Sequence, residues 1–407
     1  MASTQCLFSI ATLASLVGLL PSCPRQSASL ASGSEPLVIR AGGTYTGSYR
    51  STDSSVPCIL IETDEPVTLR GCLLFGAGDL IRATQGNAQL TVVNCRGYGL
   101  PPSADNTRPG RFLEVNSAQS VLIEHNYFEQ TSGITIYQWG GNGTARQTLT
   151  VRYNSAKNID GRYRNGGTYP AQFLQANGVH NLAGCEIAWN QIINEPNKSL
   201  VEDNISLYNS SGTPRSPVLL HDNYIQGAYP YPANATAYTG SGITLDGSAQ
   251  SAIGSTAFIE AYNNQVVSTG NAAMNIASGH DSHFHNNRIV TSGLLPDGSR
   301  LPTSWAAVAI FNHYEQPRAV FFNNTIRDNT IGFVHWGSAN PFANRQDASP
   351  GACTACTGTV HLPNPITLQT EQAEWLRWQQ KLHRQGASVG PVRTLPARRP
   401  PAITKAQ

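Results

Sequence analysis

Four side chains in the middle of the chain have the chemistry of an acid–base site. Glu202 and Asp203 are adjacent, Asp246 follows them, and His280 precedes Asp281. Carboxyl groups held close together raise one another's pKa, so that one stays protonated as an acid while another stays ionised. Such a pair suits cleavage of a glycosidic bond, and the same oxygens would suit Ca²⁺. We take Glu202, Asp203, Asp246 and His280 as candidate catalytic residues and assign no metal ligands.

Aromatic residues recur near these carboxyl groups. When the short strand-like segments of this region are aligned, one outward position forms a column that reads Tyr137, Tyr208, Asp246, Ala277, Phe311 and Trp336. Exposed rings in such a column would stack on the C–H faces of sugars, although loops packing over a sheet would use the same residues. Tyr137, Tyr208, Phe311 and Trp336 are therefore candidate substrate-binding residues.

Basic and histidine side chains supply further candidates. Arg162 and Arg164 lie in a Gly-rich insertion that we expect to overhang the same face, where they would bind an acidic substrate. Tyr163, His283 and His285 are secondary candidates, because a lyase needs a base near the proton that it removes. A single histidine is also common as a purely structural group.

A repeat along the chain must position these residues. Each unit has alternating apolar residues, then an asparagine, then an apolar residue two positions later, as in residues 121–128. The shared asparagines are Asn126, Asn154, Asn190, Asn223, Asn264, Asn287 and Asn324. The shortest interval is the 23 residues from Asn264 to Asn287, about one bare coil of a parallel β-helix, and longer intervals add loops. A second short strand follows many units, and Gly332 to Trp336 is the last of these.

This pattern predicts a solenoid. Strands of period two turn one face inward, and coils stacked about 4.8 Å apart bury one continuous aliphatic core. An asparagine at each bend tolerates unusual backbone angles and can bond to the asparagine of the next coil, so we interpret these residues as structural. Carboxyl groups on adjacent coils should then lie within roughly 10 Å of one another.

The repeat resembles that of pectate lyases, polygalacturonases and related proteins over roughly residues 38–345. The resemblance implies an all-β fold, a single right-handed parallel β-helix of the pectate-lyase-like type with a short C-terminal helix. This fold carries lyases, hydrolases, epimerases and binding proteins alike, so it does not specify an activity.

The order of the candidate residues is similar to that in polygalacturonases. That family places carboxylates on adjacent coils, then Gly-His-Gly, then Arg-x-Lys. Here Asp281 follows His280 in place of the glycine, and Val290 stands in place of the lysine after Arg288. Catalytic roles are therefore not transferred from that family.

The chain divides into five segments. Residues 1–23 read as a signal peptide, 24–36 as a linker and 37–348 as the β-helix. Residues 349–385 should form a loop and a helix packed on the solenoid or closing its open end, and 386–407 a disordered basic, Pro-rich tail.

The segments at the two ends of the chain allow more specific expectations about location and about the C-terminal helix. The sequence before Cys23 resembles a bacterial lipobox, which would make Cys23 a lipid anchor. We expect a secreted, periplasmic or surface-anchored protein. Thr370 could cap the C-terminal helix, whose Trp375, Trp378 and Leu382 share one face.

Composition limits the partners. The net charge is +2, which implies no general attraction to nucleic acid, and charged residues make up only 13% of the chain. We expect a monomer with buried thiols at Cys58, Cys72, Cys95 and Cys185. Cys353 and Cys356 should form a disulfide in an oxidising compartment.

Two functions remain open from the sequence. The first is an exported, carbohydrate-active protein that cleaves a polysaccharide, as a lyase or a glycoside hydrolase, in a groove on the outer face of the solenoid. The second is a non-catalytic protein that binds a glycan or a partner at the cell surface. The direction in which Glu202, Asp203, Asp246 and His280 point should distinguish them.

Overall fold

A computed structural model describes residues 34–237, 240–349, 351, 353 and 355–392. The predicted signal peptide, the lipobox cysteine Cys23 and the last residues of the basic tail lie outside this part of the chain. Within it, no helix is both long enough and apolar enough to cross a membrane.

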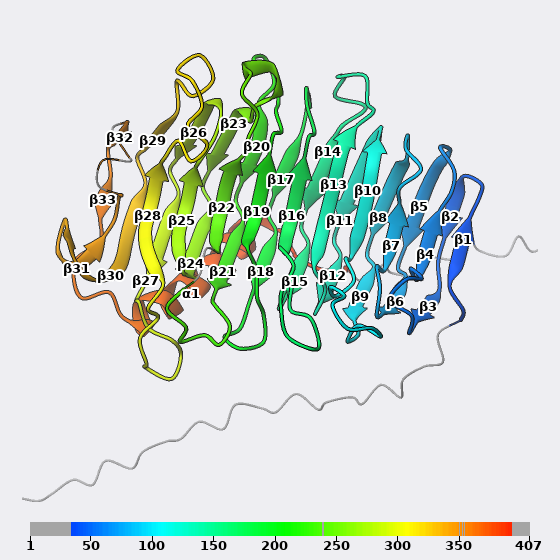
Figure 1. Ribbon diagram of the computed structural model, residues 1–407, viewed down its shortest axis with the longest axis horizontal. Helices are drawn as coiled ribbons and strands as arrows, with labels where there is room; N and C mark the ends of the chain where they lie inside the picture. The colour runs from blue at the N-terminus through cyan, green and yellow to red at the C-terminus, as the bar shows by residue number, and fades with distance from the viewer. Residues whose placement is uncertain (1–33, 238–239, 350, 352, 354, 393–407) are drawn as a thin grey trace, which may run out of the picture. The chain divides into compact units, whose positions relative to one another are not determined.

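The chain winds through three parallel sheets, with one strand of each coil in each sheet (Figure 1). Sheet 1 contains β1 (Leu37–Ile39), β4 (Ile59–Ile61), β7 (Ile81–Ala83), β10 (Leu113–Ala118), β13 (Gly133–Trp139), β16 (Gln172–Asn177), β19 (Asp203–Tyr208), β22 (Ser241–Asp246), β25 (Asn271–Ile276) and β28 (Ser304–Ile310). The prediction of a right-handed parallel β-helix is confirmed.

The other two sheets follow the same order. Sheet 2 contains β2 (Gly43–Tyr45), β5 (Pro66–Arg70), β8 (Gln89–Val93), β11 (Ser120–Glu124), β14 (Leu149–Arg152), β17 (Glu186–Ala188), β20 (Val218–His221), β23 (Ala257–Tyr262), β26 (His280–His285), β29 (Thr325–Arg327) and β32 (Cys356–Thr357). Sheet 3 contains β3 (Ser48–Ser51), β6 (Leu73–Gly76), β9 (Arg96–Gly99), β12 (Tyr127–Glu129), β15 (Ser155–Lys157), β18 (Gln191–Ile193), β21 (Tyr224–Ala228), β24 (Gln265–Thr269), β27 (Arg288–Thr291), β30 (Thr330–Asn340) and β31 (Ala343–Gln346), with β33 (Val360–His361) paired to β30.

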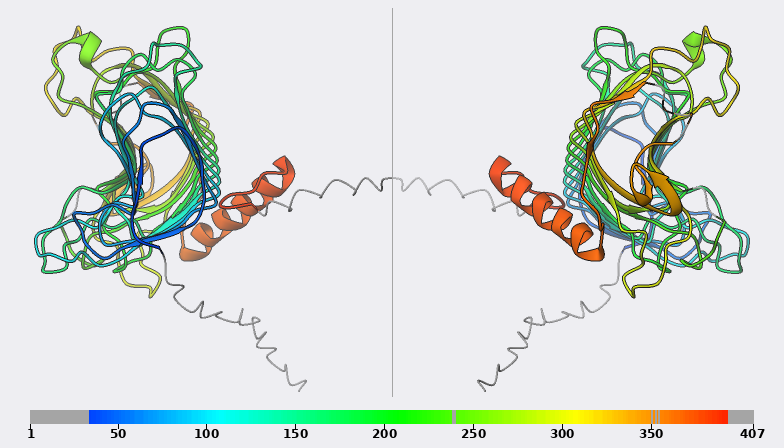
Figure 2. Two further views of the ribbon diagram at one scale, coloured as in Figure 1. Left: turned by 90° about the vertical axis from the view of Figure 1, so that its right-hand side faces the viewer. Right: turned by 90° about the vertical axis from the view of Figure 1, so that its left-hand side faces the viewer.

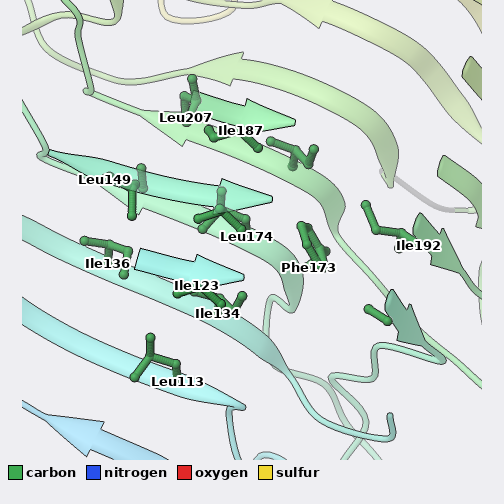
Figure 3. Close-up of a cluster of buried hydrophobic side chains, with 14 of the residues drawn as sticks. Leu113, Ile123, Ile134, Ile136, Leu149, Phe173, Leu174, Ile187, Ile192 and Leu207 are labelled. Carbon is green, nitrogen blue, oxygen red and sulfur yellow. The ribbon is translucent and has the colours of Figure 1, made fainter. Parts of the chain in front are cut away.

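The core runs through the middle of the stack because the strands alternate. In β11, Val121 and Ile123 are buried whereas Leu122 and Glu124 keep partial exposure. Equivalent residues of successive coils lie above one another, and their side chains fill the interior (Figure 3). Burial of each such aliphatic side chain contributes about 1.5–3 kcal/mol.

A ladder of asparagine side chains stabilises the bend between sheets 2 and 3. Asn190 is typical, because its Nδ2 donates to Val151 O at 2.8 Å and to Asn223 Oδ1 at 3.0 Å. Its Oδ1 accepts from the backbone N and the Nδ2 of Asn154 at 3.1 and 3.0 Å. The predicted ladder is therefore correct from Asn126 to Asn287. We expected the asparagines themselves to take the unusual backbone angles, whereas the residue before each ladder asparagine has the left-handed backbone conformation. Trp189, for example, has φ 57°.

The last predicted member of the ladder is wrong. Asn287 donates to Asn329 Oδ1 at 3.0 Å, whereas Asn324 donates to Gly279 O at 2.8 Å at a different bend. The strand of that coil is β29, which starts after Asn324, so the bend falls five residues later than the sequence pattern indicated. At the other end, Cys72 and Cys95 take the ladder position, and Cys95 N donates to Asn126 Oδ1 at 2.9 Å.

Helix α1 (Leu368–Gln385) lies against the outer side of sheet 3 rather than over an open end (Figure 2). Thr367, not Thr370, is its N-cap, and Thr370 completes a capping box. Trp378 is fully buried, with its ring 5.7 Å from that of Tyr224. The predicted packing of the helix on the solenoid is therefore present.

Part of the predicted disordered tail is ordered. Residues 386–392 follow α1 along the bend between sheets 2 and 3, where Gly390 N donates to Tyr153 O at 2.8 Å. Val392 N donates to Asn94 Oδ1 at 3.1 Å. Polar contacts with the solenoid thus fix this segment, which contains no lysine or arginine. The basic residues of the predicted tail begin at Arg393 and lie outside the described part of the chain.

The cysteines match the sequence interpretation. Cys58, Cys72, Cys95 and Cys185 are buried free thiols, and Cys353 is joined to Cys356 by a disulfide. His361 Nδ1 lies 2.7 Å from Asp347 Oδ2. The histidine that follows the cysteine pair therefore interacts with a carboxylate.

Candidate functional site

Two adjacent strands of sheet 1 bring the predicted carboxyl groups together. In the parallel register of β19 and β22, Asp203 is opposite Ser241 and Tyr208 is opposite Asp246. Glu202 directly precedes β19. These residues are far apart in the sequence, and they meet because consecutive coils stack in register.

Asp203 is the most deeply placed of these groups. Its Oδ1 accepts a hydrogen bond from Thr244 Oγ1 at 2.9 Å, and its side chain is buried. Burial, helped by the nearby carboxylates of Glu202 and Asp246, raises the pKa of Asp203 to about 8. Asp203 is therefore protonated and uncharged at neutral pH.

Glu202 and Asp246 lie at the surface of the hollow. Glu202 Oε2 accepts from Gln172 Nε2 at 2.6 Å. Although Glu202 keeps exposed surface, enclosure by the surrounding protein and the charge of Asp246 raise its pKa. Asp246 Oδ1 accepts from Gly247 N at 2.9 Å. Asp246 also bonds to the Tyr314 hydroxyl, whose pKa rises because of burial and this carboxylate.

These groups border a hollow of about 300 Å³ on the outer face of sheet 1. Its lining is polar and aromatic, and comprises Tyr137, Tyr169, Pro170, Gln175, Asn177, Glu202, Ser206, Tyr208, Asp246 and Tyr314. Arg111 donates to the Tyr137 hydroxyl at 2.9 Å and pairs with Glu114 at 2.8 Å. The hollow thus combines two carboxylates with several tyrosine rings.

Sequence reasoning missed one whole strand of this site. β16 lies between β13 and β19, so Asn177 stands between Tyr137 and Tyr208 in the column. Gln172, which holds Glu202, comes from the same strand. The alternation of Leu174 and Ala176 was the available signal, but no asparagine unit directly precedes it. Tyr314 lies in a loop and had no repeat to reveal it.

The predicted catalytic residue His280 does not lie in this hollow. His280 opens β26 of sheet 2, because the turn at Gly279 carries the chain onto the next face. Its Nδ1 lies 2.7 Å from Asp281 Oδ2 and its Nε2 3.3 Å from Ala252 O. It is therefore part of a local polar network.

Trp336 belongs to β30 in sheet 3, and its placement in the column was wrong. The five-residue error in the last ladder asparagine assigned this strand to sheet 1. The Trp336 indole N–H donates to Gly293 O at 2.9 Å, and the Arg300 guanidinium lies 4.5 Å from its ring centroid. Phe311 follows β28 in sheet 1 and is 47% exposed, outside the lining of the hollow.

The two predicted arginines lie in loops beside this face, and each is paired. Arg162 Nη2 lies 2.8 Å from Asp160 Oδ2, and the Arg162 guanidinium lies 4.3 Å from the ring centroid of Tyr231. Arg164 Nε lies 2.6 Å from Asp105 Oδ1. Neither guanidinium is an uncompensated charge.

The secondary candidates lie elsewhere or at the margin. His283 and His285 are on the outer side of β26 in sheet 2, where His283 Nδ1 contacts Thr325 Oγ1 at 2.8 Å. Tyr163 lies beside Arg162 and lines a separate hollow among the loops that join sheets 3 and 1. For metals, the described residues contain no group of three or more histidine, cysteine or carboxylate side chains arranged to hold an ion.

No family model matches the sequence, and no curated protein matches it. Among solved structures, the chain is similar to a PL6 family polysaccharide lyase from Pseudopedobacter saltans, at 10% identity and a TM-score of 0.21. The similarity covers 89% of this chain and 93% of that one.

Proposed function

We propose that this protein cleaves a glycan by acid–base hydrolysis in the sheet 1 hollow. The observation that carries the proposal is the meeting of Glu202, Asp203 and Asp246 from adjacent coils beside partly buried tyrosine rings. Environments that push the pKa values of neighbouring carboxyl groups apart are typical of acid–base sites. Three of the four predicted catalytic residues contribute to this arrangement.

The burial of each group suggests its role. Glu202 has a raised pKa and lines the hollow, so it would donate a proton to the leaving glycosidic oxygen. Asp246, held by Gly247 N–H and the Tyr314 hydroxyl, would take a proton from the attacking water. The sugar C–O bond breaks as the C–O bond to water forms. Asp203 is a positioning residue, because it is buried beneath the other two.

The charges favour hydrolysis over β-elimination. A lyase acting on a uronate must offset the sugar carboxylate and needs a base close to the proton it removes. Within the described residues, no lysine or arginine lines this hollow, and the nearby Arg111 already pairs with Glu114. The Asp246 carboxylate would repel a uronate at the point of cleavage. A neutral glycan fits this hollow better.

Export remains part of the proposal. The apolar run before Cys23 supports a secreted, periplasmic or lipid-anchored location. The disulfide between Cys353 and Cys356 is also expected in an oxidising compartment. An extracellular polysaccharide would then be the partner of the site.

A screen of neutral and uronate-containing polysaccharides tests this function. We expect new reducing ends from a neutral polysaccharide without the ultraviolet absorbance of an unsaturated product. Glu202→Gln and Asp246→Asn should each reduce the rate about 10²- to 10⁴-fold, whereas Asp297→Asn, in an exposed loop, should not. Unsaturated products would indicate a lyase. Glycan binding without cleavage would favour the non-catalytic alternative.

A further inference from the structure

The carboxylate hollow continues into two others. A hollow of about 460 Å³ shares Tyr169, Pro170 and Glu202 with it. A third hollow, of about 490 Å³, shares Thr168, Leu200 and Tyr231 with the second. The shared residues place the three hollows next to one another in a row, here called the groove, which runs from the face of sheet 1 to the loops that join sheets 3 and 1. Such a groove is longer than one acid–base site requires.

Tyr231 stands where the second and third hollows meet. Its side chain is 54% exposed, whereas the tyrosines that line the carboxylate hollow are partly buried. The guanidinium of Arg162 lies 4.3 Å from its ring centroid, and Asp160 holds that guanidinium through both carboxylate oxygens at 2.8–3.0 Å. Packing against this ion pair restrains the ring and leaves the rest of its surface toward solvent.

Among the residues that the structure describes, the lining of the groove offers apolar surface and no unpaired arginine or lysine. Pro101, Pro102 and Pro109 line the outer hollow, and Pro170 and Pro230 line the middle one. Both arginines of the outer hollow are paired, Arg162 with Asp160 and Arg164 with Asp105. The groove is therefore electrically balanced at its outer end and acidic at its inner end, which suits an uncharged ligand.

We propose that the groove binds a neutral glycan chain several sugars long, with the Tyr231 ring as a stacking platform separated from the carboxyl groups by the middle hollow. Aromatic rings that are apolar on their faces and polar at one end suit the mixed surface of a sugar. The inference rests on the proposed function for the identity of the ligand, but its binding step does not depend on cleavage.

Affinity gel electrophoresis in xylan, galactan and glucomannan, with polygalacturonate as the charged comparison, tests the platform. At least one neutral polysaccharide should retard the wild-type protein, and polygalacturonate should not. Tyr231→Ala should weaken that binding about 3- to 10-fold, as expected for loss of an aromatic stacking contact. Tyr231→Phe keeps the ring and should retain the binding. Phe342→Ala removes another exposed ring, on the turn between β30 and β31, and serves as the matched control.

Oligosaccharides of increasing length then locate the platform. The effect of Tyr231→Ala should be absent with a disaccharide and appear only with chains long enough to span the middle hollow. Equal retardation of the wild type and Tyr231→Ala, an equal loss for Phe342→Ala, or tighter binding of polygalacturonate would each overturn the inference. Binding that depends on Tyr231, with no cleavage of the bound chain, would refute the proposed hydrolysis and support the platform.

Discussion

Asp203 should make the stability of the protein depend on pH in a specific way. Its folded pKa of about 8 lies above its ordinary value of 3.8, so the folded state binds the extra proton between these values. Stability is therefore unaffected below pH 3.8 and falls as the pH rises toward 8. Each pH unit costs about 1.4 kcal/mol, and the roughly three units up to pH 7 give on the order of 4 kcal/mol.

Asp203→Asn removes this titration while keeping the side-chain size. The variant should be more stable than the wild type at pH 7, by several kcal/mol, and should lose that advantage toward pH 4. Urea unfolding at one-unit intervals from pH 4 to 8 measures the difference, and Asp64→Asn, at an exposed position, is the control. A stability difference between Asp203→Asn and wild type that stays constant with pH would refute the protonated, buried state of Asp203.

Three other substitutions test the ladder, the helix and the site. Asn190→Ala should destabilise the solenoid by about 3 kcal/mol or more in urea unfolding, because it leaves buried backbone and amide groups without partners. Trp378→Ala should cost about 3–5 kcal/mol, and hydrogen exchange should show faster opening of α1 than of the strands beneath it. Tyr314→Phe removes the hydroxyl that bonds to Asp246, so we expect steady-state kinetics to show a lower kcat with little change in KM.

Periodicity made the architecture predictable. The alternation of buried and exposed residues and the recurring asparagines are consequences of local strand geometry and of stacking between neighbouring coils. They identified the solenoid and the ladder from Asn126 to Asn287. The error at Asn324 arose because an apolar loop segment before β29 imitates a strand, and only the hydrogen bond to Asn329 reveals the true bend.

The residues of the site were less predictable, because loop conformations and turn lengths determine which side chains reach the hollow. Alignment of adjacent strands correctly joined Tyr208 to Asp246. It could not show that a turn places His280 on another sheet or that Asp160 neutralises Arg162. It also gave no reason to choose Tyr314 or Tyr231, because residues in inserted loops obey no repeat. The relative burial of Glu202 and Asp203, on which their roles depend, is a tertiary property.

At Cys72 and Cys95, thiols take the place that asparagine amides have in the rest of the ladder. The two ends of the ladder therefore differ in chemistry. Sulfur is a weak hydrogen-bond partner, so the bend between sheets 2 and 3 has weaker side-chain hydrogen bonds at Cys72 and Cys95 than at the asparagines from Asn126 onward. Residues near the start of the chain would then depend on the central coils as a template.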